Sequence, residues 1–141
     1  MRVSIVSGGF DPLHIGHVEL FEKARAISDS LLVIVNTDEF LIEKKGKPFM
    51  LMGERMKIID SLEVVDLAIA SKDEDQTVCK TLTILASIKD PDDELFFCNG
   101  GDRTSGENTP EHKVCELLGI KSVYGLGDKV QSSSWLTEEK G

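Results

Sequence analysis

Short apolar, β-branched runs alternate along the chain with stretches whose apolar residues recur at helical spacing. The runs predict strands over residues 3–6, 31–35, 64–70, 95–98 and 121–124. The stretches between them predict helices over 16–27 and 53–62, a helix that begins at 73–75, one from Pro110 to Gly119 and a short one that opens at Ser132. Strands that alternate with helices are typical of a parallel sheet with right-handed crossovers.

The pattern therefore predicts an α/β protein, a Rossmann-like three-layer α/β/α fold with a five-stranded parallel sheet. A length of 141 residues suits one domain over 1–141. Ligands of such sheets bind outside the carboxyl ends of the strands, where the strand order reverses. The segments expected at these ends are Gly8–Gly9, Asn36–Asp38, Asn99–Asp102 and Gly125–Ser134.

The composition of the chain argues against several classes of partner and location. The net charge of −9 argues against a nucleic-acid surface, which needs a basic face. No apolar stretch approaches the roughly 18 residues that span a membrane, and the short apolar start does not have the form of a signal peptide, so a cytoplasmic protein is expected. The three cysteines are scattered and form no CxxC pair, which favours reduced thiols and no metal site.

The segment SGGFDPLHIGH, residues 7–17, follows the first strand directly. Glycine permits a close approach of the backbone to a ligand and tolerates positive φ, and an Asp-Pro pair can brace and stiffen a turn. The start of a helix adds unpaired N–H groups and a positive dipole end. The segment therefore predicts a phosphate-binding loop whose nucleotide-binding residues are Gly8, Gly9, Phe10, Asp11 and Gly16.

His14 and His17 in this segment share one face of the expected helix, because residues three apart are neighbours there. Two imidazoles can donate hydrogen bonds to phosphate oxygens and stabilise the charge of a transition state. For an isolated HxxH the ordinary interpretation is a capping histidine beside a satisfied surface histidine. The preceding strand, the paired glycines and the Asp-Pro turn favour the catalytic interpretation.

The loop resembles the HxGH loop of the nucleotidyltransferase superfamily, whose fold is shared with class I aminoacyl-tRNA synthetases. The string His14-Ile15-Gly16-His17 matches the synthetases' HIGH motif, but the chain is too short, has no KMSKS and carries no basic surface for tRNA. Across nearly its whole length the chain is similar to small cytidylyltransferases and sugar-phosphate adenylyltransferases.

The resemblance points to two kinds of enzyme. Asn36–Phe40 is similar to glycerol-3-phosphate cytidylyltransferases, whereas Leu62–Asp66 and Gly100–Asp102 look more like heptose-phosphate adenylyltransferases. The chain departs from the cytidylyltransferases at Gly127–Val130, where they carry RTxG, and at Glu63, where they tend to carry arginine. CTP and ATP therefore both stay open, and CTP is favoured.

The resemblance also implies further site residues. Lys44 would contact the triphosphate or the incoming phosphate and act in catalysis. Asp38, Lys47 and Arg55 would contact the acceptor or its phosphate, although a lysine run is usually a solvated face and Arg55 could pair with Glu54 or Asp60 instead. The remaining nucleotide-binding candidates are Gly101, Asp102, Arg103, Ser132, Ser133 and Ser134.

These residues predict transfer of a nucleoside monophosphate from a nucleoside triphosphate to a phosphorylated small polyol, alcohol or sugar, with release of pyrophosphate. Positioning and charge stabilisation suffice for such a reaction. Mg²⁺ would arrive on the triphosphate rather than in a protein cage. The resemblance further implies a homodimer. The competing interpretation is a nucleotide-binding module without chemistry.

Overall fold

The computed structural model describes residues 1–100 and 109–126, in which strands and helices alternate as the sequence predicts. Its sheet has five parallel strands in the order β3-β2-β1-β4-β5. The strands are β1 (Arg2–Gly8), β2 (Ser30–Val35), β3 (Leu67–Ala70), β4 (Glu94–Gly100) and β5 (Lys121–Leu126). The helices are α1 (Ile15–Ala26), α2 (Asp38–Lys45), α3 (Met52–Asp60), α4 (Cys79–Ile88) and α5 (Pro110–Leu118).

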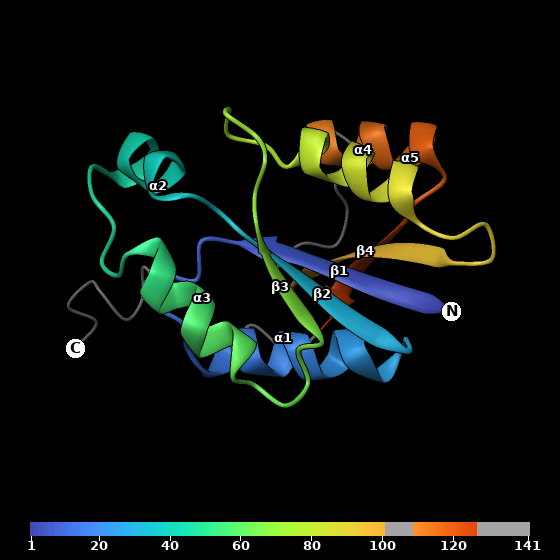
Figure 1. The fold of residues 1–141 in the computed structure, drawn as a ribbon, viewed down its shortest axis with the longest axis horizontal. Helices are drawn as coiled ribbons and strands as arrows, with labels where there is room; N and C mark the ends of the chain where they lie inside the picture. The colour runs from blue at the N-terminus through green and yellow to red at the C-terminus, as the bar shows by residue number, and fades with distance from the viewer. Residues whose placement is uncertain (101–108, 127–141) are drawn as a thin grey trace.

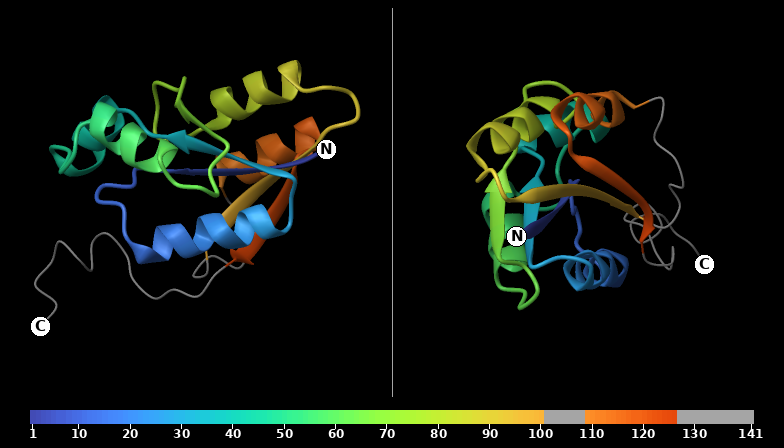
Figure 2. Two further views of the ribbon diagram at one scale, coloured as in Figure 1. Left: turned by 60° about the horizontal axis from the view of Figure 1, so that its bottom comes forward. Right: turned by 90° about the vertical axis from the view of Figure 1, so that its right-hand side faces the viewer.

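Helices cover both faces of the sheet, which confirms the predicted three-layer α/β/α architecture. Helices α1 and α3 lie on one face and α4 and α5 on the other, while α2 lies beyond the carboxyl end of β2 (Figures 1 and 2). Neighbouring strand residues serve opposite faces: Ile5 packs with α4 and α5, and Val6 packs with α1 and α3. The continuous apolar runs of the sequence thus reflect a sheet that is buried on both sides.

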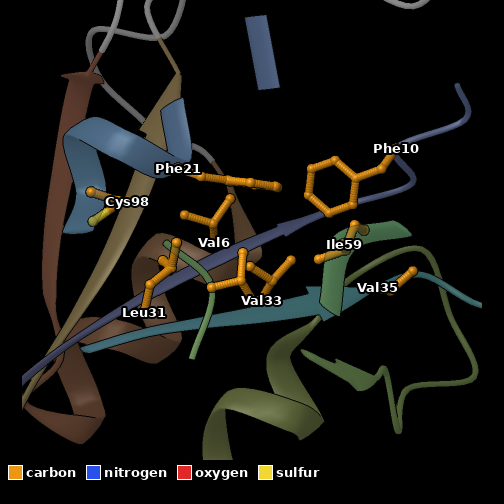
Figure 3. Close-up of a cluster of buried hydrophobic side chains, with 10 residues drawn as sticks. Val6, Phe10, Phe21, Leu31, Val33, Val35, Ile59 and Cys98 are labelled. Atoms are coloured by element: carbon orange, nitrogen blue, oxygen red, sulfur yellow. The ribbon is translucent and has the colours of Figure 1, made fainter. Parts of the chain in front are cut away.

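The larger core cluster lies between the sheet and helices α1 and α3 (Figure 3). Phe21 of α1 and Ile59 of α3 are fully buried there against Val33 of β2. Burying one such side chain stabilises a fold by about 1.5–3 kcal/mol. This cluster therefore anchors α1, whose first turn carries the two histidines.

The strand order reverses next to β1. The chain passes from β1 outward to β2 and β3, then crosses to β4 on the other side of β1 and continues to β5. The carboxyl ends of β1 and β4 consequently diverge into connections that run in opposite directions. Such a switch point is where open α/β sheets bind ligands.

Helix α2 is not among the predicted elements, and its last turn contains Lys44 and Lys45 of the lysine run. The local signals for this helix are present. The Thr37 hydroxyl accepts from the Phe40 N–H at 3.0 Å, and acidic residues in the first turn and lysines in the last turn suit the helix dipole. Gly46, with φ of 94°, ends the helix in a conformation that other residues rarely adopt.

Helix α4 begins later than predicted, at Cys79 rather than at 73–75. The Asp73 carboxylate lies outside the helix and accepts from the backbone N–H groups of Lys80 and Thr81, both at 2.8 Å. It caps the helix from seven residues upstream, so its preference for a helix start is satisfied at a distance. Ile88, expected on the buried side, ends the helix and is 70% exposed.

Strand β3 is shorter than predicted, and helix α5 agrees with the prediction. Strand β3 covers only Leu67–Ala70 of the expected 64–70, and Val65 contributes to the core from the turn before it. Helix α5 begins at Pro110, as predicted, with Thr109 as its N-cap, and it ends before Gly119. The expected helix at Ser132 lies outside the described residues.

Candidate active site

The loop between β1 and α1 is organised by Phe10. Its φ of 53° is the left-handed conformation that was expected at a glycine, and its ring lies in the core, 5.3 Å from the Phe21 ring and 5.0 Å from the His17 ring between centroids. A Cβ at Gly8 would lie 2.9 Å from Cζ of Phe10. The room left by Gly8 is therefore filled by the ring of Phe10, which is 4% exposed and packs in the core. A nucleotide contact of Phe10 stays a prediction.

Asp11 braces the loop from within. It is 3% exposed, and its carboxylate accepts from the backbone N–H groups of Phe49 and Met50 and pairs with Lys45 at 2.7 Å. Burial would raise the pKa of Asp11, but these hydrogen bonds outweigh burial and lower the pKa below its usual value. These bonds confirm the bracing role and bury the carboxylate against the α2–α3 connection. The predicted contact with nucleotide stays a prediction.

His14 and His17 begin α1 with a reciprocal pair of caps. The Gly16 N–H donates to Nδ1 of His14 at 3.1 Å, and the His14 N–H donates to Nδ1 of His17 at 3.1 Å. The rings stack with centroids 3.8 Å apart. The capping interpretation therefore holds for both histidines, and the caps fix the orientation of both rings.

Burial decides the charge of the two rings, and the caps decide which nitrogen carries the proton. Burial lowers the pKa of His14, and burial followed by the neighbouring His14 lowers the pKa of His17 to about 3. Both rings are neutral near pH 7, and because each Nδ1 accepts a hydrogen bond, the proton of each ring is on Nε2. Nε2 of His14 is buried and has no partner among the described residues. A buried donor without a partner is costly, so this atom is arranged for a ligand.

The first turn of α1 favours an anion at the same place. It contains no acidic residue, so the positive end of the helix dipole is not neutralised from within the turn. Gly16 lies in this turn and gives its N–H to His14. The N–H groups of residues 14 and 16–18 are bonded within the turn, so this helix start favours an anion through its dipole rather than through free N–H groups.

A cavity of about 360 Å³ opens at the switch point. Its wall is formed by the ends of β1, β2 and β4, by Leu20 of α1, by the loop before α4 and by the start of α5. The residues are Ser7, Gly8, Leu20, Asn36, Phe40, Gln76, Thr77, Val78, Phe97, Cys98, Asn99 and Glu111. The predicted convergence of the strand ends at 8–9, 36–38 and 99–100 thus agrees with the position of the cavity.

Asn36, one of the lining residues, carries the other unpartnered polar atom. His14 and His17 are not among the described residues that line the cavity. Asn36 is 7% exposed, and its Oδ1 is buried without a hydrogen-bond partner among the described residues. Oδ1 is an acceptor, so it calls for a hydroxyl or amino group, which the phosphates of a nucleotide do not offer. Its position after a strand was noted in the sequence, but its role as a site residue was not predicted.

Arg55 is buried, and its guanidinium is bonded to protein groups. It is 1% exposed, and its guanidinium donates to the carbonyl oxygens of Met50, Gly9 and Asn36 at 2.7–2.9 Å. It also pairs with Asp38 at 2.8 Å. The partner is therefore neither Glu54 nor Asp60, and the planar fork of the side chain ties four backbone segments together beneath the site.

The other predicted acceptor-binding residues differ in their exposure. Asp38 accepts from Arg55 and from the Met52 N–H at 2.9 Å, so its carboxylate joins α2 to α3 rather than facing a phosphate. Lys44 and Lys47 are exposed. Nζ of Lys44 lies 5.7 Å from the centroid of the Phe40 ring. Phe40 lines the cavity, whereas Lys44 is not among the described lining residues.

Several predicted residues lie outside the described part of the chain: Gly101, Asp102, Arg103, Ser132, Ser133 and Ser134. Conversely, sequence reasoning missed Phe40, Gln76, Thr77 and Glu111 as lining residues. Phe40 belongs to α2, which was not predicted, and Gln76 and Thr77 precede α4, whose start was predicted too early. Glu111 follows a proline at a helix start, where an acidic residue is ordinary, so the sequence offered no signal for it.

Within residues 1–100 and 109–126 there is no group of three or more His, Cys, Asp or Glu side chains that could hold a metal ion. We therefore derive no step through a protein-held metal. Cys98 and Cys115 are buried free thiols and Cys79 is a partly exposed one, in line with the prediction of reduced cysteines.

In the part of the chain that the structure covers, no helix combines the length and the apolar character needed to cross a bilayer.

Known proteins are similar to this chain in sequence. Glycerol-3-phosphate cytidylyltransferase of Bacillus subtilis (strain 168) is 37% identical over 126 residues, which cover 89% of this chain and 91% of that protein. The bifunctional protein HldE of Actinobacillus succinogenes is 41% identical over 131 residues, and the match covers 92% of this chain but 24% of that protein.

A solved structure and a family model agree with these relatives. The crystal structure of the lipopolysaccharide core biosynthesis protein from Thermoplasma volcanium GSS1 has a TM-score of 0.69 and 29% identity, and the match covers 90% of this chain and 97% of that one. The family model described as cytidylyltransferase-like matches residues 5–127. The chain therefore belongs to the cytidylyltransferase-like family and is a nucleotidyltransferase.

Proposed function

We propose that the enzyme transfers CMP from CTP to the phosphate of a small polyol or alcohol and releases pyrophosphate. The observation that carries this proposal is the stacked His14–His17 pair, whose neutral rings have their protons on Nε2, with Nε2 of His14 buried and unpartnered. A phosphate oxygen is the acceptor that such a donor at a helix N-terminus suits best.

The reaction needs no covalent enzyme intermediate. An oxygen of the acceptor phosphate attacks the α-phosphorus in line, a new P–O bond forms, and the bond to the β-phosphate oxygen breaks with its electron pair on pyrophosphate. His14 and His17 donate from Nε2 to the oxygens on which charge accumulates, a contribution that is typically worth ~10²–10³ in rate per donor. Lys44 adds positive charge from the last turn of α2.

The remaining predicted contacts extend this scheme. Ser132, Ser133 and Ser134 would bind the departing pyrophosphate, and Gly101, Asp102 and Arg103 would contact the nucleotide. Mg²⁺ would enter with the triphosphate and neutralise part of its charge. We further propose a single domain over residues 1–141, a homodimer and a cytoplasmic location.

CTP and a polyol phosphate are favoured by the relatives that match along their whole length. The Bacillus subtilis protein named glycerol-3-phosphate cytidylyltransferase matches over 91% of its length, whereas the chain spans about a quarter of the HldE proteins. The unpartnered Oδ1 of Asn36 also fits a hydroxyl-bearing substrate.

A second candidate is adenylyl transfer from ATP to a heptose-type sugar phosphate. It is supported by the 41% identity to HldE of Actinobacillus succinogenes. A module that binds nucleotide without chemistry is the third, and it would release no pyrophosphate.

The test combines binding with turnover. We expect CTP with Mg²⁺ to raise the melting temperature more than ATP, GTP or UTP, because a ligand that binds the native state stabilises it by mass action. Pyrophosphate release should then require both CTP and a phosphate such as glycerol 3-phosphate. Selective stabilisation by ATP with turnover of a sugar phosphate would establish the second candidate, and binding without pyrophosphate release from any acceptor would establish the third.

A further inference from the structure

Glu111 lies where the start of α5 meets the start of α4. Its Oε2 accepts from the Val78 N–H at 3.2 Å, and Val78 is the N-cap of α4, whose own side chain cannot cap. The bond holds the carboxylate at the wall of the cavity, beside the residues from the end of β4. Its second oxygen, Oε1, receives no hydrogen bond from the described residues.

Glu111 is the one charged residue among the described residues that line the cavity. A carboxylate in a partly buried site repels a phosphate and accepts hydrogen bonds from hydroxyl or amino groups. The phosphates of a substrate would therefore lie away from Glu111, on the side of the cavity where the end of β1 leads into the loop before α1. The two ends of the site differ in the chemistry that each accepts.

The geometry points to Glu111 as the residue that binds a hydroxyl group of the substrate and so sets the direction in which the substrate lies in the cavity. The inference rests on the proposed function, because it takes the ligand to carry phosphate at one end and hydroxyl groups at the other. Two parts of the reacting pair have such hydroxyls, the ribose of the nucleotide and the carbon chain of the acceptor.

The test compares each natural substrate with an analogue that lacks one hydroxyl. The nucleotide series is CTP, 2′-deoxy-CTP and 3′-deoxy-CTP, with ATP and its deoxy forms if ATP is the substrate. The acceptor series is glycerol 3-phosphate against the two propanediol phosphates, or the acceptor in use against its deoxy forms. We expect one series to lose ~10-fold or more in kcat/KM in the wild-type enzyme, because a hydrogen bond to a charged group is lost.

Glu111→Gln then identifies the partner. Glutamine keeps an oxygen for the Val78 N–H but removes the charge, so the wild-type ratio between hydroxyl and deoxy substrate should shrink several-fold for that series alone. The control is Glu116→Gln on the same helix, whose carboxylate is exposed and pairs with His112. It should leave the ratio unchanged.

The outcomes separate the inference from the proposed function. A shrunken ratio in the nucleotide series assigns Glu111 to the ribose, and one in the acceptor series assigns it to the acceptor. If the wild type turns over but the ratios are unchanged in Glu111→Gln, the inference alone is overturned. The same holds if the active wild type does not discriminate against any deoxy substrate. A wild type that releases no pyrophosphate overturns the proposed function and the inference with it. Should Glu111→Gln not fold, Glu111→Asp keeps the charge but withdraws it by one methylene, and the ratio should shrink in the same series.

Discussion

Each histidine of the HxGH segment has two nitrogens with separate tasks. Nδ1 accepts a backbone N–H and begins the helix, whereas Nε2 keeps the proton, and in His14 this atom is buried without a partner among the described residues. The sequence allowed the positions of His14 and His17 and their shared face to be predicted. It could not reveal that capping fixes the tautomer, because that depends on the backbone of the loop and on the Phe10 ring against which His17 packs.

His14→Asn separates these two tasks. Asparagine is a good N-cap and can keep the bond from Gly16, but it lacks a donor at the position of Nε2. We expect kcat to fall ~10²–10³-fold while the melting temperature changes by less than about 3 °C, which corresponds to roughly 1 kcal/mol. Steady-state pyrophosphate release and calorimetry measure the two quantities. His14→Ala serves as the comparison that also loses the cap, and near-normal turnover of His14→Asn would contradict the role of Nε2.

The low pKa of His17 predicts how folding stability depends on pH. The pKa is about 3 in the folded chain and 6.5 for an unperturbed histidine, so the unfolded chain binds the extra proton between these values. Stability is therefore complete above about pH 6.5 and is lost as the pH falls toward 3, by at most about 1.4 kcal/mol per pH unit.

His17→Gln tests this dependence. Glutamine at this position of a capping box can accept from the His14 N–H without titrating. The wild type should lose stability faster than His17→Gln in urea titrations from pH 7 to pH 4.5, and the difference isolates His17 from the carboxylates. Parallel curves for the two proteins would show that His17 titrates normally in the folded chain.

At the scale of elements, the site depends on a brace that the sequence did not disclose. Arg55 of α3 holds the β1–α1 loop, the end of β2, the start of α2 and the α2–α3 connection together. Most strands and helices could be predicted, because their apolar periodicity reflects burial. The start of α4 could not, since Asp73 caps it from seven residues upstream, beyond the reach of local patterns. Helix α2 was missed although its cap and its charged ends are local signals.

Arg55→Lys tests the brace. Lysine keeps a charge for Asp38 but cannot reach the carbonyl oxygens of Gly9, Asn36 and Met50 at once, and unpaired buried groups are costly. We expect a loss of about 3 kcal/mol and a fall in melting temperature of roughly 10 °C. Lys57→Ala on the exposed side of the same helix should change the melting temperature little. A change in the KM for the acceptor with an unchanged melting temperature would support the phosphate-binding interpretation of Arg55.

At the scale of the whole molecule, the cavity joins the two halves of the sheet. Asn36 and Phe40 reach it from the half that contains β2 and β3, whereas Asn99 and Glu111 reach it from the half that contains β4 and β5. The protein is acidic overall, yet the described lining carries one charged residue, and the donors at α1 are neutral. If the proposed function holds, hydrogen bonds and a helix dipole, which act at short range, would hold the phosphate rather than the net charge of the protein.

A substrate that occupies this cavity should stabilise both halves together. At a CTP concentration of 100 times Kd, mass action adds about 2.7 kcal/mol to the free energy of any opening that releases the ligand, so the exchange of the amides involved should slow by up to about 100-fold. Hydrogen exchange followed by mass spectrometry should show this protection at the start of α1, in residues 76–78 and at the start of α5. The exposed side of α3 serves as the internal control. Protection confined to one half of the sheet would contradict a ligand that spans the switch point, and it would identify the half that binds the nucleotide.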